Sequence, residues 1–460
     1  MKGSRSRTPA AHLCFATLLS LSLVLAFNGS ASAEKILLKA DGWEVFTDGR
    51  VAGFVSQVNG DGNPSGGQPG NYVLTYPDGM MVRDTVLGGG WSVATPNQNT
   101  QVNPPVQGTT NQTRIRSGFL GNQFNFGVRG QVTPYTTVTG YISIWAFIES
   151  ISQAKANANP ADVRQGYAKL EGPWGSFLAG RTRTLFSRGA TDIDVLYAHR
   201  WGVGFPGATA IDSNGPTAGQ VGFGVMGSGF AAALIYGTPV LGGFHLNVGA
   251  FDPSTLSGGS LTRTGYPRAE AEATFERTFG GSGKIVLFVN GLYQNVYKSG
   301  FCDPATNGGP CETTAAGVGY GGRFELGPVH IGLAGHYGQG LGLGYALENS
   351  PGAFDDEGNP RRIDGYYAQS QFVLGRFDLF AGWGITRIFL TALDKAAAPA
   401  GTDPSPESVI KYQMGTNAGV VFNMSPNVHF DLEYFRAQAA WWLGEKQVLN
   451  TGDFGMTFNW

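Results

Sequence analysis

The chain has 460 residues, of which 71 are Gly, 12% are aromatic and only 14% are charged. Globular proteins average about 25% charged residues, so the composition disfavours a typical cytosolic enzyme. An apolar content of 42% is too high for a disordered chain, and the formal net charge of −2 offers no basic surplus for nucleic acid. Beyond residue 33 the longest apolar run, residues 230–236, is too short for a membrane-spanning helix of about 20 residues.

The first 33 residues have the three parts of a signal peptide. A basic start, an apolar stretch and an A-x-A cleavage site follow one another: Lys2, Arg5 and Arg7, then residues 13–27, then Ala31, Ser32 and Ala33. We therefore expect residues 1–33 to be a signal peptide cleaved after Ala33, and residues 34–460 to form one domain. An uncleaved anchor is the alternative. The mature chain keeps 28 basic and 33 acidic residues, a net charge of −5.

Two cysteines, Cys302 and Cys311, remain after cleavage and flank a Gly/Pro-rich segment. In an exported protein such a pair is most simply a disulfide that closes one loop. The alternative, a metal site, has no nearby histidine. We expect the disulfide.

Many segments of the mature chain alternate apolar and polar residues with a period of two. In residues 428–434, for example, Val, Phe, Leu and Tyr alternate with His429, Asp431 and Glu433. Because side chains alternate across a strand, each such segment has one apolar and one polar face. A soluble sandwich turns the apolar face inward, whereas a transmembrane barrel turns it outward to lipid and surrounds water with the polar face.

The connections between these segments are alternately short and long. The short ones lie at residues 133–136, 172–175, 239–243, 280–283, 327–328, 374–376 and 424–427. The long, polar ones cover about residues 59–112, 152–161, 185–229, 252–266, 298–312, 339–362, 389–408 and 439–446. Outer-membrane barrels have tight periplasmic turns and large external loops. The pattern therefore predicts an all-β fold, a transmembrane antiparallel β-barrel of about 16 strands with long extracellular loops.

The last predicted strand ends on an aromatic residue. Apolar residues share one of its faces: Val448, Phe454, Met456, Phe458 and Trp460. This ending resembles the signal that the barrel-assembly machinery reads during insertion, so Phe458 and Trp460 are its candidate residues.

Several stretches resemble the general diffusion porins of Gram-negative outer membranes. They are residues 41–50 (DGWEVFTDGR), 126–130 (FGVRG), 163–170 (VRQGYAKL), 175–181 (GSFLAGR) and 236–244 (YGTPVLGGF). The resemblance implies a 16-stranded homotrimeric barrel in outer-membrane lipid whose third long loop folds into the lumen and sets the pore size. The segment after Arg181 lacks the family's acidic PEFGGD sequence, so size cut-off and ion selectivity do not carry over.

A pore of this kind needs no catalytic residue, cofactor or metal, because lumen diameter and rings of charge select the solute. We expect passive diffusion of small hydrophilic solutes and ions through a charged constriction. In the third loop, Asp192 and Asp194 form a same-face acidic pair if the segment is extended. The opposite wall would carry basic residues of the barrel: Arg129, Arg164, Arg181 and Arg183. Solvated loop or interface charges are the alternative reading of each arginine.

Arg164 matches the eyelet arginine of the resembled family, and Arg181 matches a position nearer the subunit interface. Arg164 shares its face with Gly166, Ala168 and Leu170, so it faces inward only with a β-bulge or a buried subunit contact nearby. Five acidic residues lie on predicted lumen faces: Glu270, Glu272, Glu276, Asp431 and Glu433. Together with the net charge they predict a mild cation preference.

Three other functions are open. A substrate-specific, sugar-type channel would use lumen aromatics such as Tyr197 and Trp201 of the third loop. An outer-membrane barrel enzyme would need a nucleophile motif, and none of the five mature-chain histidines lies in one. A secreted β-rich adhesin would have no pore. The expected partners are outer-membrane lipid, further copies of the chain, the barrel-assembly machinery and small hydrophilic solutes, with no nucleic acid.

Overall fold

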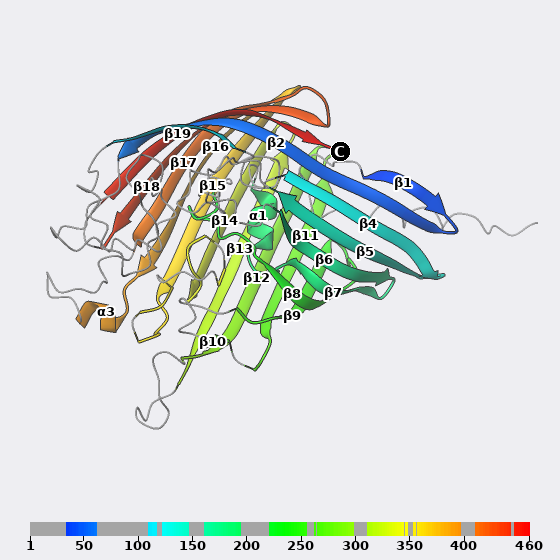
Figure 1. The fold of residues 1–460 in the computed structure, drawn as a ribbon, viewed down its shortest axis with the longest axis horizontal. Coiled ribbons are helices and arrows are strands. Elements are labelled where there is room, and N and C mark those ends of the chain that lie inside the picture. Colours follow the sequence, from blue (N-terminus) through cyan, green and yellow to red (C-terminus); the bar gives the residue numbers. More distant parts are fainter. Residues whose placement is uncertain are drawn as a thin grey trace, which may run out of the picture.

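The structure is a computed structural model. It describes residues 34–61, 109–116, 122–146, 161–194, 220–254, 262–263, 265–298, 311–344, 346–347, 353–355, 357–396, 410–442 and 446–460. These residues form one sheet of antiparallel strands that curves into a barrel, with a short helix, α1 (Arg188–Ile193), inside it (Figure 1). None of the helices in these ranges is long and apolar enough to cross a membrane.

The strands follow one another around the barrel in chain order. They are β1 (Lys35–Ala40), β2 (Trp43–Asp61), β3 (Thr109–Arg116), β4 (Asn122–Thr133), β5 (Thr136–Ala146), β6 (Ala161–Gly172), β7 (Gly175–Arg183), β8 (Phe230–Gly237), β9 (Phe244–Phe251), β10 (Thr262–Arg263), β11 (Arg268–Phe279), β12 (Gly283–Tyr297), β13 (Glu312–Leu326), β14 (Val329–Gln339), β15 (Arg362–Leu374), β16 (Phe377–Phe389), β17 (Ile410–Asn423), β18 (Val428–Trp441) and β19 (Lys446–Asn459).

The barrel closes where β19 pairs with β2, from Leu449 opposite Gly60 to Asn459 opposite Arg50. β3 and β4 pair with successive parts of β2 and so occupy one position in the wall. β1 is a hairpin addition to β2, and β10 is a two-residue strand on the edge of β12. The result is the closed 16-stranded antiparallel barrel that the sequence predicts.

The predicted alternation of short and long connections is confirmed except between β18 and β19, where a long loop was expected at about residues 439–446 and only residues 442–445 join the strands. Seven connections of a few residues join β4 to β5, β6 to β7, β8 to β9, β11 to β12, β13 to β14, β15 to β16 and β17 to β18. Because strands alternate in direction, all of these turns lie at one end of the barrel and the long loops lie at the other. The two ends match the periplasmic and extracellular ends of an outer-membrane barrel.

The half of β18 nearest the β17–β18 turn shows which way the apolar face points. Leu432 and Tyr434 are 57% and 47% exposed on the outside of the barrel, whereas Asp431 and Glu433 are each 3% exposed on the inside. A soluble sandwich would bury the first pair and expose the second. The outward apolar face is therefore the lipid-facing surface of a transmembrane barrel.

The C-terminal residue completes the junction between the last strand and the first. The backbone N–H of Trp460 donates to the Gly49 carbonyl at 3.1 Å, and the Gly49 N–H donates to the Trp460 carbonyl at 3.0 Å. The indole lies directly over Gly49, where an added Cβ would come within 2.2 Å of the ring. Phe458 stacks on the same indole with centroids 5.8 Å apart. The assembly role of Phe458 and Trp460 stays a prediction.

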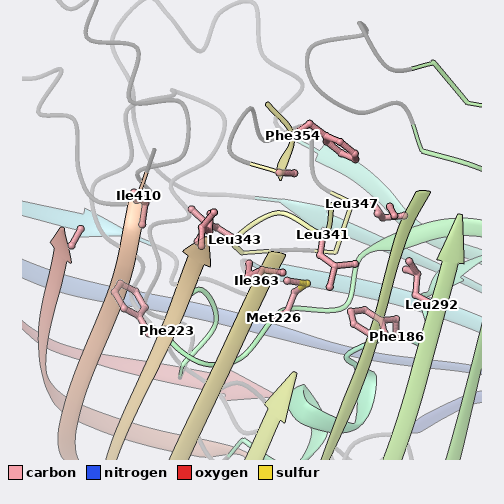
Figure 2. Close-up of a cluster of buried hydrophobic side chains, with 14 of the residues drawn as sticks. Phe186, Phe223, Met226, Leu292, Leu341, Leu343, Leu347, Phe354, Ile363 and Ile410 are labelled. Carbon is pink, nitrogen blue, oxygen red and sulfur yellow. The ribbon is translucent and has the colours of Figure 1, made fainter. Parts of the chain in front are cut away.

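An apolar cluster lines the inside of the barrel toward its long-loop end, which the sequence reading did not expect (Figure 2). Its wall residues include Leu292, Ile363, Ile410 and Phe435, and two loops cover them from within. The third long loop contributes Phe186, Phe223 and Met226, and the β14–β15 loop contributes Leu341, Leu343, Leu347 and Phe354. The expectation of a polar inner face is thus wrong for this part of the wall, because the loops replace water there.

The β14–β15 and β16–β17 loops are tied together by a buried ion pair. Arg361 Nε and Nη2 each donate to one carboxylate oxygen of Asp394 at 2.8 Å, and both side chains are 5% exposed. Asp394 lies in a short helix, α3 (Ala392–Ala396), and its Oδ2 also accepts the Thr391 amide. Burial by itself would raise the pKa of Asp394, but the hydrogen bonds from Arg361 and Thr391 outweigh it and hold the pKa below its ordinary value.

A lowered pKa means that this loop contact stabilises the fold at neutral pH and is lost as the pH falls through the pKa of the folded protein. We expect amide hydrogen exchange of residues 391–396, corrected for its intrinsic pH dependence, to accelerate below about pH 4. Asp394→Asn should show the fast exchange already at neutral pH, with about 3 kcal/mol of local stability lost because Arg361 stays buried without its charge partner. Glu312→Gln, at an exposed rim carboxylate, is the matched control, and equal exchange in both variants would contradict the assignment.

Candidate functional site: the pore constriction

The third long loop enters the barrel. Its described parts, residues 184–194 and 220–229, start and end side by side, where the Thr184 amide donates to the Gly229 carbonyl at 2.9 Å. α1, which belongs to the first of these parts, packs on the inner faces of β12, β13 and β14 (Figure 1). Residues 220–224 lie along the β15–β17 wall, where the Gly224 amide donates to Thr386 Oγ1 and Gln413 Nε2 donates to the Gly222 carbonyl. The predicted folding of this loop into the lumen is confirmed.

Two glutamates of β11 hold the start of the loop. Glu270 Oε2 accepts the Phe186 amide at 2.8 Å, and Glu272 Oε2 accepts the Gly189 amide at 2.9 Å. Glu272 Oε1 also accepts from Arg188 Nε at 2.8 Å, and Glu270 pairs with Arg268 at 2.7 Å. Both were expected to be open lumen charges. Both lie on the inner face, but each accepts a loop amide and pairs with an arginine, so each carboxylate anchors the loop.

Close packing also seats α1 against the wall. An added Cβ at Gly189 would lie 2.3 Å from Cγ of Phe288 on β12, so the helix backbone rests directly on that ring. Only glycine permits this approach, and the helix therefore sits as near to the wall as a backbone can.

The predicted acidic pair of the loop is not a pair. Asp192 and Asp194 were expected on one face of an extended segment, but they lie in and just after α1 and point apart. Asp194 is fully buried, and its Oδ2 accepts the Gln220 amide at 2.9 Å. Asp192 keeps a 36% exposed side chain and pairs with Arg183 Nη1 at 2.7 Å. Arg183 Nε also donates to Ser228, so this arginine braces the loop instead of lining the opposite wall.

The opposite wall of the lumen consists of β2, β4, β5 and β6, half of the ring away from β13. Antiparallel pairing aligns its inward residues in three rows. From the turn end outward, these rows are Glu44–Arg129–Thr139–Lys169, Phe46–Gly127–Tyr141–Tyr167 and Asp48–Asn125–Ser143–Gln165. The wall that faces α1 is thus charged, then aromatic, then polar.

Arg129 is the one predicted arginine that lies on this wall in line with the rows. Its Nε donates to Glu44 at 2.8 Å, its Nη1 donates to Glu34 at 2.6 Å, and its guanidinium lies 4.9 Å from the centre of the Phe46 ring. The sequence reading did not foresee these two acidic partners, which neutralise it locally.

Arg164 sits at a β-bulge, one of the two arrangements that its position required. Ser143 pairs with Gln165 while Ile144 pairs with Val163, so Arg164 is the extra residue. Its guanidinium lies 4.6 Å from the Trp145 ring and its Nε lies 3.3 Å from Asp162. The bulge lets Gln165 and Tyr167 remain on the inner face.

The placement of Arg181 on the lumen wall is wrong. Arg181 is exposed on the outer face of β7, in line with Phe177 and Ala179, because strand alternation fixes that side. Its Nε donates to the Arg164 carbonyl at 3.2 Å.

The remaining predicted acids lie on the inner face. Glu276 pairs with Lys284 at 2.8 Å near the turn end of β11. Asp431 and Glu433 are buried on β18, where Glu433 lies opposite Asp453 of β19. Within the residues that the structure describes, no cluster of His, Cys, Asp and Glu could hold a metal ion. Tyr197, Trp201 and Cys302 lie outside the described residues, and Cys311 directly precedes β13.

The sequence reading missed Asp48, Tyr141 and Tyr167 on the inner wall. The period-two pattern held the signal, because Tyr141 alternates with the outward Ile142, and Tyr167 alternates with the outward Ala168. The bulge at Arg164 hid the signal for Tyr167, because alternation counted forward from an inward Arg164 puts Tyr167 on the outer face.

A closed barrel with an apolar outer belt and a loop folded across its lumen defines the class of membrane channels. Similar solved structures agree with this class. The outer-membrane channel DcaP of Acinetobacter baumannii superimposes with a TM-score of 0.59 at 15% identity, over 92% of this chain and 99% of that chain. The anion-selective porin of Comamonas acidovorans gives 0.55 at 11% identity, over 91% and 100%. At such identities the likeness concerns the fold alone.

The family profile of Gram-negative porins matches residues 19–439. The chain therefore belongs to the Gram-negative porin family, as the resemblance of its strands indicates, and it is an outer-membrane channel for the diffusion of solutes. None of the curated proteins matches it.

The anchoring role of Glu272 has a measurable consequence. Glu272→Ala removes the acceptor of the Gly189 amide and the partner of Arg188, so α1 should loosen from the wall. We expect single-channel recordings to show greater open-channel noise and a changed conductance. Glu276→Ala removes a carboxylate from the same face of β11 without touching the loop and should leave the noise unchanged. Equal noise in the two variants would refute the anchor.

Proposed function

We propose that the protein is a general diffusion porin, in which small hydrophilic solutes and ions pass between α1 and the β2–β6 wall. The supporting observation is the anchored loop. Glu270 and Glu272 hold its backbone against one side of the barrel, while the opposite side presents polar and charged rows to the lumen. Membership of the porin family supports a channel over an enzyme, and we propose no catalytic activity.

We further propose a mild preference for cations. Among the described residues, most charges near the constriction are paired: Arg183 with Asp192, Arg188 with Glu272, and Arg129 with Glu34 and Glu44. The mature chain retains an acidic surplus, and the carboxyl groups of Asp431, Glu433 and Asp453 lie on the inner wall. The Comamonas protein is anion-selective by its name, but it shares only the fold, so its preference does not carry over.

Planar-bilayer recording of the refolded mature chain tests both proposals. A reversal potential under a KCl gradient should show cation preference in the wild type. Asp192→Lys should shift it toward anions, because Asp192 is the partly exposed acid of α1, and Arg164→Glu should shift it toward cations. Glu312→Lys, outside the lumen, is the control. Unchanged selectivity in both lumen variants would remove Asp192 and Arg164 from the constriction but leave the channel intact.

We propose that the channel is a homotrimer. Arg181 supports a subunit contact on the outer face of β5–β7, because a charge facing lipid at mid-membrane costs about 2–4 kcal/mol. Its neighbours across the sheet, Gly166 and Ala232, are small and leave room for another chain. Conductance that rises in groups of three equal steps would support the trimer.

We also propose that the chain is processed after Ala33 and that Cys302 and Cys311 form a disulfide. The Lys298 amide donates to the Cys311 carbonyl at 2.8 Å, which supports the disulfide because it holds the two ends of the loop side by side. We expect an intact mass that begins at Glu34 and increases by two hydrogens on reduction. A mass that includes residues 1–33, or that is unchanged on reduction, would contradict the respective proposal.

The sugar-type channel remains the alternative. Its candidate aromatics, Tyr197 and Trp201, lie outside the described residues, but Tyr141 and Tyr167 provide aromatic surface on the lumen wall. Block of the current by an oligosaccharide that saturates with concentration would favour it over general diffusion.

A further inference from the structure

The aromatic row of the lumen wall is continuous over four strands. Phe46, Tyr141 and Tyr167 point inward from β2, β5 and β6, and the Phe46 ring covers Gly127 of β4, where an added Cβ would come within 2.0 Å of it. Ring centroids are 6.4 Å apart between Phe46 and Tyr141 and 5.4 Å apart between Tyr141 and Tyr167. These separations are typical of favourable aromatic contacts, so the rings form one surface.

Tyr141 and Tyr167 are the part of that surface that a solute can reach. Phe46 is 3% exposed because Arg129 lies over it, whereas both tyrosines keep partly exposed side chains. The accessible surface therefore lies in the middle of the barrel, one row above the charged row of Arg129 and Lys169.

Asp48 borders the aromatic surface on its other side. Its Oδ1 accepts from Asn125 Nδ2 at 2.5 Å, and its Oδ2 accepts from the Tyr141 hydroxyl at 3.4 Å. Both donors are neutral. In the part of the chain that the structure describes, no lysine, arginine or histidine forms an ion pair with Asp48.

This sets Asp48 apart from the acids around it. On the same wall Glu44 is paired with Lys39 and Arg129, and Glu171 is paired with Lys169. On the loop side Glu272 is paired with Arg188, and Asp192 is paired with Arg183. A partly exposed carboxylate with neutral partners can attract a cation from the lumen. The paired acids attract a cation much more weakly, because a cationic side chain already neutralises each of them.

We propose that Asp48, Tyr141 and Tyr167 form a binding site for organic ammonium ions that carry an aromatic ring. The ammonium group binds the Asp48 carboxylate and lies at the edge of the Tyr141 face, while the ring of the solute stacks on the two tyrosines. The site names the solute class that the proposed channel retains longest, so it rests on the proposed function.

A neutral sugar ring fits the tyrosines less completely than an ammonium ion. It gains the stacking contact but leaves the Asp48 charge without a counterion. An anion would be repelled by the same carboxylate. The charge beside the rings therefore favours the cationic class.

Titration calorimetry of the folded protein in detergent tests the site without requiring conductance. Phenethylammonium is the probe, and 2-phenylethanol, its neutral counterpart, is the matched ligand. We expect saturable binding of phenethylammonium and binding of 2-phenylethanol that is at least about tenfold weaker, the change that one charged hydrogen bond produces. Equal binding of the two ligands would overturn the role of Asp48 and leave an aromatic platform that fits sugars.

Three variants locate the site. Asp48→Asn should weaken phenethylammonium about tenfold and leave 2-phenylethanol unchanged, because the amide keeps the shape but not the charge. Tyr141→Leu and Tyr167→Leu should weaken both ligands. Asp378→Asn, an inward aspartate of β16 hydrogen-bonded to Asn423, is the matched control and should bind as the wild type does. Heat-modifiable migration verifies that each variant folds, and wild-type affinity in a folded Asp48→Asn would refute the site.

Single-channel recording then separates this inference from the proposed function. Transient block by phenethylammonium, lost in Asp48→Asn, supports both. Binding by calorimetry in a chain that shows no conductance would retain the site and refute the porin. Conductance without block or binding would retain the porin and refute the site.

Discussion

Hydrogen bonding of the backbone in hydrocarbon is the constraint on which the structure depends. A strand inside a membrane has no water for its N–H and C=O groups, so each must pair with a neighbouring strand and the sheet must close on itself. The closure falls between β19 and β2, and the Trp460–Gly49 pair completes it at the C-terminus. Once the sheet is closed, alternation gives one face of every strand to lipid and the other to the interior.

The need to pair backbone groups away from water also explains why one side of the inner face carries loops and the other side faces the solute. A loop inside the barrel brings backbone amides and apolar side chains away from bulk water, and both require partners. Glu270 and Glu272 supply acceptors for the amides, and inward residues such as Ile363 and Phe435 supply contacts for Phe223 and Met226. One side of the wall therefore works as a seat for the loops, and the β2–β6 side is left to face the solute.

Charge at the constriction is organised by this division. The carboxylates under the loop are bonded to loop amides and arginines. Their presence in the sequence therefore says little about the electrostatic field that an ion meets in the lumen. On the β2–β6 wall, Glu34 and Glu44 neutralise the charge of Arg129. The carboxylate of Asp48, in contrast, has the neutral Tyr141 hydroxyl beside it. The solute therefore meets a field set by which charges remain unpaired after folding, more than by their total number.

The turns, the closed barrel and the faces of the regular strands were predictable, because they follow from local chemistry: a period of two, tight turns at fixed intervals and an aromatic end. Leu432 against Glu433 is an example in which neighbouring residues suffice to tell lipid from lumen. Arg181 obeys the same alternation, and its expected placement in the lumen was wrong because its positive charge was given more weight than the face it shares with Phe177 and Ala179.

What no local pattern contains is the pairing of side chains from distant segments. Asp194 against Gln220, Glu272 against Gly189 and Asp48 beside Tyr141 meet only when the loop has entered the barrel or when strands have aligned in register. A carboxylate in the sequence is equally an anchor or a lumen charge until its neighbours are known. The chain thus specifies its membrane orientation residue by residue, whereas the barrel's closure decides which charges a solute encounters, because pairing depends on distances that only the folded chain establishes.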